Sequence, residues 1–265
     1  MNNAFPPAVA ALLGELAALP YENLSKIVAF HKSGSPETAQ DVSAHWLQDH
    51  ARSGLGGTCF SLTHWLKIRL DALGFSTAYL MADKPSTYTH REPNIHCGLL
   101  FEHRFEHGVE PGNPHSRRLY LLDPGYLIFE PLLLPSAGLS VSTFISPNEI
   151  RLEDASGEGA WRLHTGPRAG PLKHRFDFRK EPVTSAEFER HWEASHHWPM
   201  MNYPVLNRVQ NGVQYYLQKN NLLIRSEHSG EMKKLDGEGV RRAAREIFGL
   251  PQGLIEEALG LLEKK

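Results

Sequence analysis

Apolar residues in the first third of the chain recur at three- and four-residue steps, which is the spacing of an amphipathic helix. One such run starts at Pro7 and stops at Pro20, and its apolar positions are Val9, Leu12, Leu13, Leu16 and Leu19. A second helix is expected after Pro36, and a third leads from Cys59 to Gly74. This pattern predicts a set of packed helices at the start of the chain.

From residue 75 the pattern changes to short apolar runs bounded by turn residues. The runs are 78–81, 95–101, 119–122, 127–134, 141–145 and 161–163. Their brevity and spacing predict an antiparallel sheet or a small barrel. Residues 102–118, which are polar and rich in glycine and proline, are expected to form an extended hairpin loop.

The last part of the chain mixes both periods. A helix is expected at 187–195, a hairpin at 214–217 and 222–225, and a closing helix at 239–248. The order is therefore helices, then strands, then a smaller α/β tail, so the predicted fold class is α+β.

Composition removes several classes of function. The 28 basic and 30 acidic side chains among 265 residues give a formal net charge of −2, which argues against a nucleic-acid scaffold or a polybasic membrane binder. No apolar stretch approaches the roughly 20 residues of a membrane span, and the apolar N-terminus lacks the basic flank of a signal peptide. Two cysteines form no disulfide framework or zinc motif, so we expect a cytoplasmic protein without a metal.

Cys59 is the strongest candidate for chemistry, because it lies between a glycine-dense turn at 53–57 and the first turn of a predicted helix. Unpaired N–H groups and the helix dipole at this position favour the thiolate. The alternative is a buried structural cysteine in a helix that happens to follow glycines.

A thiolate nucleophile needs an imidazole partner and a group that orients the ring. His96 opens a predicted strand, and Asp123 closes another before Pro124 and Gly125, so the two could meet across a hairpin. With 15 histidines in the chain, a satisfied core histidine and a turn-forming aspartate remain the alternatives. Cys97 follows His96 directly and should point to the opposite face of the strand, as core filling.

Several motifs resemble those of the arylamine N-acetyltransferase family, in the same order along nearly the whole chain. Residues 20–24 read Pro-Tyr-Glu-Asn-Leu, residues 56–60 read Gly-Gly-Thr-Cys-Phe, and residues 95–100 resemble the family's catalytic histidine strand. Residues 121–126 resemble its Val-Asp-Val-Gly-Phe segment. A Phe-Asp-Phe element at 176–178 and an Ile-Phe-Gly element at 247–249 extend the match.

The resemblance implies a three-part enzyme: a helical bundle (1–84) carrying Cys59, a β-barrel (85–190) carrying His96 and Asp123, and an α/β lid (191–265). It implies transfer of an acetyl group from acetyl-CoA to an arylamine, arylhydrazine or N-hydroxyarylamine, by a ping-pong route through a Cys59 thioester. His96 would be the partner of the thiol, and Asp123 would orient the imidazole.

The same resemblance implies that Phe60 and Tyr126 line the acceptor pocket and that Gly125 lies near the acetyl-CoA entrance. For these three residues, the alternatives are core aromatic side chains and a turn glycine.

The chain also departs from the family pattern. Leu55 stands where the family has arginine, Ser61 where it has glutamate, and Pro124 where it has an aliphatic residue. Joint loss of the two charges of an ion pair is less disruptive than the loss of one, which leaves the other without a partner. Two other hypotheses stay open: a transglutaminase-like amidase or peptidase that does not use CoA, and an inactive binding module of the same fold.

Overall fold

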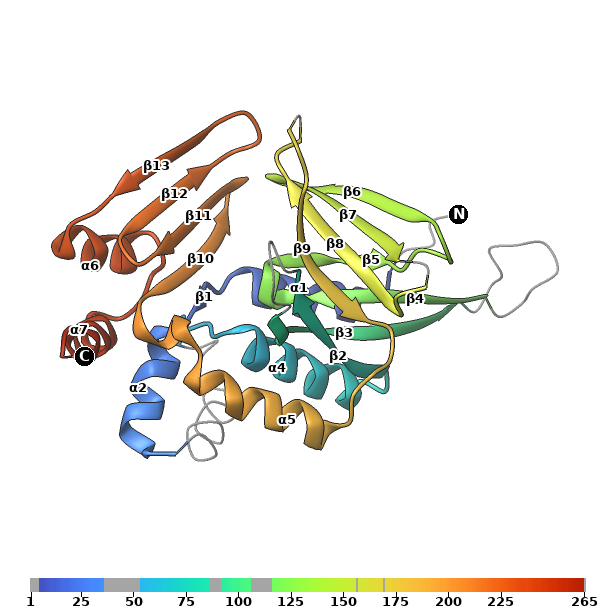
Figure 1. Cartoon of the computed structure of the whole chain (residues 1–265), viewed down its shortest axis with the longest axis horizontal. Coiled ribbons are helices and arrows are strands. Elements are labelled where there is room, and N and C mark those ends of the chain that lie inside the picture. Colours follow the sequence, from blue (N-terminus) through green and yellow to red (C-terminus); the bar gives the residue numbers. More distant parts are fainter. Residues whose placement is uncertain are drawn as a thin grey trace.

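The computed structural model describes residues 5–35, 53–85, 92–105, 116–155, 157–168 and 170–264. Within these ranges the chain forms N-terminal helices, a nearly closed antiparallel barrel of eight strands, and a C-terminal sheet covered by helices (Figure 1). The predicted α+β fold class is therefore confirmed. The helix expected after Pro36 lies outside the described residues.

In the described part of the chain, three helices precede the barrel: α1 (Pro7–Ala17), α2 (Leu24–Ser33) and α4 (Cys59–Ala72). Helices α1 and α4 agree with the apolar spacing, and the expected apolar positions of α1 are buried. The sequence pattern did not predict α2. None of the helices in the described ranges is long and apolar enough to cross a membrane.

The barrel strands pair in the order β5-β4-β3-β2-β9-β8-β7-β6, all antiparallel. Their bounds are β2 (Ser76–Lys84), β3 (Glu92–Phe105), β4 (Ser116–Asp123), β5 (Ile128–Leu133), β6 (Ser140–Ile145), β7 (Asn148–Ala155), β8 (Ala160–Gly166) and β9 (Lys173–Arg179). All six predicted strands are present, whereas β7 and β9 were not predicted. Both carry several charged residues, so the apolar runs used for prediction are absent there.

The predicted loop at 102–118 is shorter than expected. Residues 102–105 pair with residues 116–119 as the outer part of the β3–β4 hairpin. An antiparallel hairpin can keep a polar face toward water, so polar composition alone does not exclude a strand. The remaining residues of the expected loop, 106–115, are not described.

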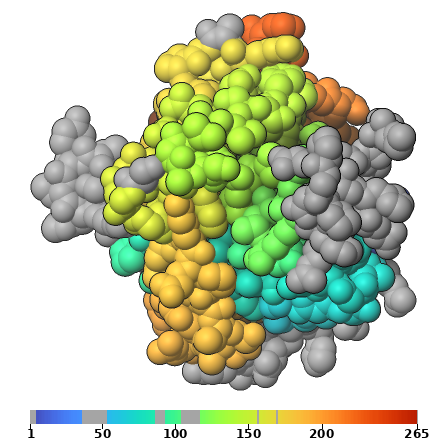
Figure 2. Space-filling view, turned by 90° about the vertical axis from the view of Figure 1, so that its right-hand side faces the viewer, coloured from blue at the N-terminus to red at the C-terminus, as the bar shows by residue number. Residues whose placement is uncertain are grey.

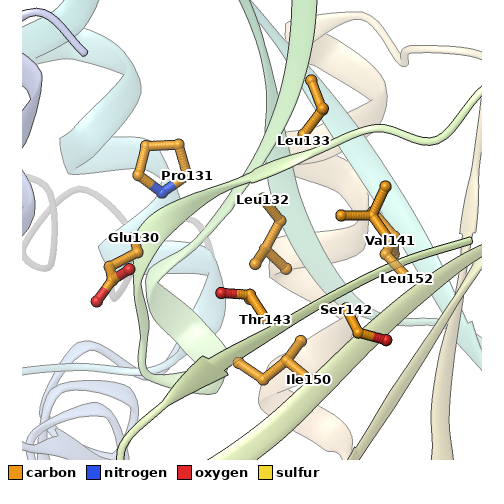
Figure 3. Close-up of a pocket in the computed structure, with 9 residues that line it drawn as sticks. All are labelled: Glu130, Pro131, Leu132, Leu133, Val141, Ser142, Thr143, Ile150 and Leu152. Carbon is orange, nitrogen blue, oxygen red and sulfur yellow. The ribbon is translucent and has the colours of Figure 1, made fainter. Parts of the chain in front are cut away.

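The barrel is incomplete where its edge strands β5 and β6 approach each other. A cavity of about 240 Å³ lies along this seam, and its lining includes Leu132, Leu133, Val141, Thr143, Ile150 and Leu152 (Figure 3). None of the predicted site residues lines it. The seam is therefore separate from the candidate chemistry.

Helix α5 (Ser185–Ala194) follows the barrel. Its N-cap residue is Thr184, whose hydroxyl accepts a hydrogen bond from the Glu187 N–H at 3.2 Å. Figure 2 shows the barrel strands in green and yellow above α5 in amber and the segment around α4 in cyan. The aromatic rings of Phe60 and Phe188, 5.2 Å apart, join α4 to α5.

The C-terminal sheet has the order β1-β10-β11-β12-β13. Its strands are β1 (Tyr21–Glu22), β10 (Val205–Gln210), β11 (Val213–Gln218), β12 (Asn221–Arg225) and β13 (Gly230–Lys234), and helices α6 (Gly237–Glu246) and α7 (Gln252–Glu263) follow. The expected hairpin is β11–β12, and the expected closing helix is α6. The pattern did not predict α7.

Elements from the N-terminal part of the chain complete the C-terminal unit. Strand β1 is the edge of its sheet, and Leu24, Ile27 and Val28 of α2 belong to the same apolar core as Val240 and Phe248. In turn, β2 belongs to the barrel. These elements cross the predicted boundaries at 84/85 and 190/191, and the three-part division of residues stays a prediction.

The side chain of Asn23 holds the N-terminal segment to the C-terminal part of the chain. Its amide nitrogen donates to the carbonyls of Met200 at 2.7 Å and Tyr203 at 2.9 Å, and its oxygen accepts from the Val205 N–H at 2.8 Å. The side chain is completely buried. One residue therefore satisfies three backbone groups that lie about 180 positions away.

We expect Asn23→Ala to lower the free energy of unfolding by at least about 2 kcal/mol, because three backbone groups lose a partner and each such loss costs about 1–3 kcal/mol. Urea denaturation followed by circular dichroism would measure it. Asn221→Ala, at an exposed position, is the matched control and should change little. Equal stability of the two variants would contradict this role for Asn23.

Candidate active site

Cys59 is the first residue of α4, after Thr58 in an extended conformation. The turn that precedes it packs directly on the N-terminal segment. The Gly57 carbonyl accepts from the Glu22 N–H at 3.0 Å, and a Cβ at Gly56 would lie 1.5 Å from the Pro20 carbonyl oxygen. Only glycine fits so close to another backbone. The turn and the helix start that the sequence predicts are both present.

The β3–β4 hairpin brings His96 and Asp123 together as predicted. The Nε2 atom of His96 lies 2.9 Å from both carboxylate oxygens of Asp123. The Oδ1 atom of Asp123 also accepts from the Tyr126 N–H at 3.0 Å, which caps the short turn Pro124–Tyr126. The carboxylate is 0% exposed, so its charge is balanced by these groups.

His96 is also a neighbour of Cys59, because both side chains lie against Gly125. Its ring stacks on Phe176 at 4.2 Å and meets Tyr126 and Phe178 edge to face. Cys59 and His96 are each 4% exposed. The structure thus places a thiol, an imidazole and a carboxylate side by side, with the imidazole ring packed between aromatic neighbours.

The electrostatic surroundings favour a thiolate at Cys59 and an imidazolium at His96. A hydrogen bond from Cys97 is the largest influence on the pKa of Cys59, and His96 and Lys26 also lower it, so that it falls well below its usual range although burial opposes. Burial lowers the pKa of His96, but Asp123 and Cys59 outweigh this effect and raise it to about 10. Both shifts favour the thiolate of Cys59 together with the imidazolium of His96.

Gly125 lies against the two reacting groups. A Cβ there would lie 2.5 Å from the Cβ of Cys59 and 3.2 Å from Cε1 of His96. Phe60 is completely buried, between Phe188 and Trp198. Tyr126 is partly buried, and its hydroxyl lies 3.4 Å from the Thr165 hydroxyl. The predicted substrate and cofactor roles of these three residues stay predictions.

Cys97 is completely buried in the apolar core between α4 and β3, which agrees with the prediction that it fills the core. Neighbouring strand residues point to opposite faces. Although it is core filling, Cys97 is the largest influence on the pKa of Cys59. The His96 ring lies on the barrel side, among Phe176 and Phe178.

Lys26 of α2 is a buried charged group that sequence reasoning did not find. It is buried, its ammonium group donates to the Ser195 hydroxyl, and its charge acts on Cys59. Burial lowers its pKa to about 7, although Cys59 and Cys97 oppose this effect. No sequence signal marks this lysine, because α2 itself was not predicted.

Metal ligation has no support in the described part of the chain. Within those ranges no group of three or more His, Cys, Asp or Glu side chains could hold a metal ion.

Known proteins resemble this chain over almost its full length. A family model described as N-acetyltransferase matches residues 10–254. The arylamine N-acetyltransferase of Mycobacterium abscessus has a similar structure, with a TM-score of 0.74 and 17% identity over 97% of this chain and 89% of that one. That of Nocardia farcinica gives 0.74 and 19% identity over 97% and 88%.

The Mycobacterium marinum arylamine N-acetyltransferase, whose structure is a complex with CoA, gives a TM-score of 0.73 and 18% identity over 95% of this chain and 91% of that one. At these identities the structural matches show the fold. A search of curated protein sequences finds no match.

The ion pair predicts that Cys59 is the reactive thiol. An ordinary thiol with a pKa of about 8.5 is under about 1% thiolate at pH 6, so limiting iodoacetamide at pH 6 should label Cys59 at least ~10-fold faster than Cys97. Peptide mapping by mass spectrometry measures the ratio. In His96→Gln this preference should shrink at pH 6, and preferential labelling of Cys97 in the unsubstituted protein would overturn the assignment.

Proposed function

The chain belongs to the arylamine N-acetyltransferase family, and from this premise we propose that it transfers an acetyl or other short acyl group from acyl-CoA to an arylamine, arylhydrazine or N-hydroxyarylamine. The single observation that carries the proposal is the series in which Cys59 and His96 lie side by side against Gly125, and His96 forms a hydrogen bond with the buried Asp123 at 2.9 Å. Such a series activates a thiol and returns its proton.

In the first half-reaction, the Cys59 thiolate attacks the carbonyl carbon of the acyl thioester. The new carbon–sulfur bond forms as the bond to the CoA sulfur breaks, and the His96 imidazolium gives its proton to the departing CoA thiolate. One thioester replaces another, so the exchange is near thermoneutral. The amino-terminal end of α4 favours the negative charge that develops beside Cys59.

In the second half-reaction, the acceptor nitrogen attacks the acylated Cys59. His96, now neutral, accepts the proton of the nitrogen, and the Cys59 thiolate leaves. The amide product and the original thiolate–imidazolium pair result. An arylamine suits this step because it is weakly basic, so its lone pair is free at neutral pH.

The acyl-enzyme must also resist water. Cys59, His96 and Asp123 are all buried, which supports a lifetime long enough for an acceptor to reach the thioester. We further propose that Tyr126, edge to face with His96, and Phe60 line the acceptor pocket, and that Gly125 borders the acyl-CoA entrance. An aromatic acceptor fits beside such rings.

Two of the three departures from the family pattern, those at Leu55 and Ser61, are compatible with an active site. Leu55 packs against the C-terminal apolar core, and the Ser61 hydroxyl donates to the Thr58 carbonyl at 3.0 Å. Neither position leaves a buried charge without a partner. The pair of changes thus replaces charges with an apolar contact and a local hydrogen bond.

We expect acetyl-CoA alone to add one acetyl group to the protein, at Cys59. Intact-mass spectrometry should show this mass gain in the unsubstituted protein and none in Cys59→Ala, and an added arylamine or hydrazine should restore the starting mass. The measurement follows both half-reactions separately.

Other outcomes favour the other hypotheses. If short acyl-CoA esters leave the protein unmodified while it cleaves or transfers amide groups, a transglutaminase-like activity is indicated. If the folded protein does neither, a binding module of the same fold is indicated.

We expect Asp123→Asn to keep the fold but to lower turnover at least ~10²-fold, because the asparagine loses the charge that stabilises the imidazolium and can favour the wrong tautomer. Steady-state acetylation of an arylamine measures the effect. Asp71→Asn, which removes a surface partner of Lys67, is the matched control and should retain turnover. Near-normal turnover in Asp123→Asn would remove this carboxylate from the mechanism.

A further inference from the structure

Two arginines lie where the barrel meets the C-terminal sheet, outside the series of reacting groups. Arg175 belongs to β9 of the barrel, and Arg225 is the last residue of β12 (Figure 1). Both are partly buried. Among the described residues, the hydrogen-bond partners of their guanidinium groups are neutral side chains, and neither arginine forms an ion pair with a carboxylate. Two cations without an acidic partner at one junction need an explanation.

A β-bulge directs Arg175. The register between β8 and β9 shifts at this point, and Arg175 is the residue of β9 that is left without a partner across the ladder. A bulge turns a side chain away from the regular alternation of a strand. The Nε atom of Arg175 donates to the Thr165 hydroxyl at 2.9 Å. The next residue, Phe176, stacks on His96, so this cation is placed beside the candidate active site.

Two amide oxygens orient Arg225. Its Nη2 atom donates to the Gln214 oxygen at 2.6 Å and to the Asn148 oxygen. The Gln214 nitrogen donates in turn to Asn207 at 3.0 Å, so the Gln214 oxygen is turned toward the arginine. The Nε atom of Arg225 is buried and has no hydrogen-bond partner among the described residues. Amide oxygens accept hydrogen bonds but leave the charge of the guanidinium unbalanced, and a buried charge is stabilised by an ion of opposite sign.

A small cavity of about 30 Å³ lies between the two sheets at this point. Tyr126 and Thr165 line it from the barrel, and Gln214 and Arg225 line it from the C-terminal sheet. The Tyr126 hydroxyl lies 3.4 Å from the Thr165 hydroxyl. The space admits about two water-sized groups, which is the size of the two oxygens of a carboxylate. A pyrophosphate group is too large for it.

The charges around the cavity are positive. Burial raises the pKa of Tyr126, and both Arg175 and Arg225 oppose this effect. Burial lowers the pKa of Arg225, and Arg175 lowers it further. The two cations thus act on the same tyrosine and on each other, and an anion between them would relieve their repulsion.

The C-terminal sheet relates this cavity to the nucleophile. Strand β1 bridges to the turn before Cys59, and through β10 it lies in one row with Tyr216 of β11. Gln214, which pairs with Arg225, lies two residues farther along β11 on the same face. Two residues of a strand span about 7 Å. This offset is about the length of a para-substituted benzene ring.

The barrel gives the same relation through Tyr126. Its ring meets His96 edge to face, with the ring centres 6.1 Å apart, and its hydroxyl lies at the cavity. A substrate that lies along this ring would have its reacting atom beside His96 and its far end beside the two arginines.

We propose that Arg175 and Arg225, together with the Tyr126 hydroxyl, bind a carboxylate of the substrate, so that the preferred substrates carry an acid group remote from the reacting atom. The proposal rests on the acyl transfer proposed above and names a substrate class for it. Guanidinium groups hold a carboxylate by charge-assisted hydrogen bonds. The carboxylate belongs either to the acyl chain or to the acceptor amine, and the experiment has one arm for each source.

The acceptor arm uses 4-aminobenzoate and 4-aminobenzamide, which have a similar shape and differ in charge. The protein is first loaded with acetyl-CoA, and the decay of the acetyl-enzyme is followed by intact-mass spectrometry. The acyl arm compares loading by malonyl-CoA with loading by isovaleryl-CoA, an uncharged donor of similar shape. In at least one arm, the unsubstituted protein should prefer the carboxylate-bearing compound.

We expect this preference to fall at least ~10-fold in Arg175→Gln and in Arg225→Gln, which is the effect of losing a hydrogen bond to a charged group. Arg242→Gln, at an exposed position of α6, is the matched control and should keep the preference. The arm in which the preference falls identifies the source of the carboxylate.

Several outcomes would overturn the proposal. One is the lack of a preference for the carboxylate in both arms, and another is an unchanged preference in either arginine variant. Equal slowing of loading by acetyl-CoA and by malonyl-CoA would assign the arginines to a part that all CoA esters share, which also contradicts the proposal.

A binding measurement without turnover separates this proposal from the proposed function. At constant ionic strength, 4-aminobenzoate or malonate should raise the melting temperature saturably and more than 4-aminobenzamide or malonamide does. The difference should disappear in Arg225→Gln and persist in Arg242→Gln. If the protein accepts no acyl group, the proposed function fails, and this measurement still decides whether the two arginines bind a carboxylate.

Discussion

The buried carboxylate of Asp123 is the constraint from which the rest of the site follows. A charge with no exposure needs partners, and here they are the Tyr126 N–H and the His96 ring at 2.9 Å from both oxygens. The carboxylate raises the pKa of His96 although burial of the ring lowers it, and His96 in turn lowers the pKa of Cys59. Each buried charge thus exists because the next one balances it, which couples the barrel to the helices.

Such a series needs backbones that approach one another closely. Gly56 lets the start of α4 lie against the N-terminal segment, and Gly125 lets the end of β4 lie against Cys59 and His96. A side chain at Gly56 or Gly125 would separate elements that carry the reacting groups. The glycines near the site are therefore part of its geometry, in addition to shaping turns.

The sequence predicted those parts of the fold and site that depend on local pattern. Helix α4, the six apolar strands, and the meeting of His96 with Asp123 follow from spacing, turn residues and strand ends. Strands β7 and β9 were missed because they alternate charged and apolar residues, and α2 because its apolar face is short. The position of Cys97 in the same apolar core as Cys59 depends on which face of β3 the helix covers, and that is decided by packing between distant segments.

The segment 20–24 was marked in the sequence only by its resemblance to a family motif, and the structure supplies the physical reason for its residues. Glu22 pairs with Gly57 through its backbone and caps α2 by accepting from the Ser25 N–H at 2.9 Å, while Asn23 binds three backbone groups of the C-terminal part. Tyr21 pairs with Asn207 in the C-terminal sheet and bridges to Gly57. Five consecutive residues therefore join the C-terminal sheet to the turn that presents Cys59. A change in this segment would act on the nucleophile through the backbone, although none of its side chains belongs to the series of reacting groups.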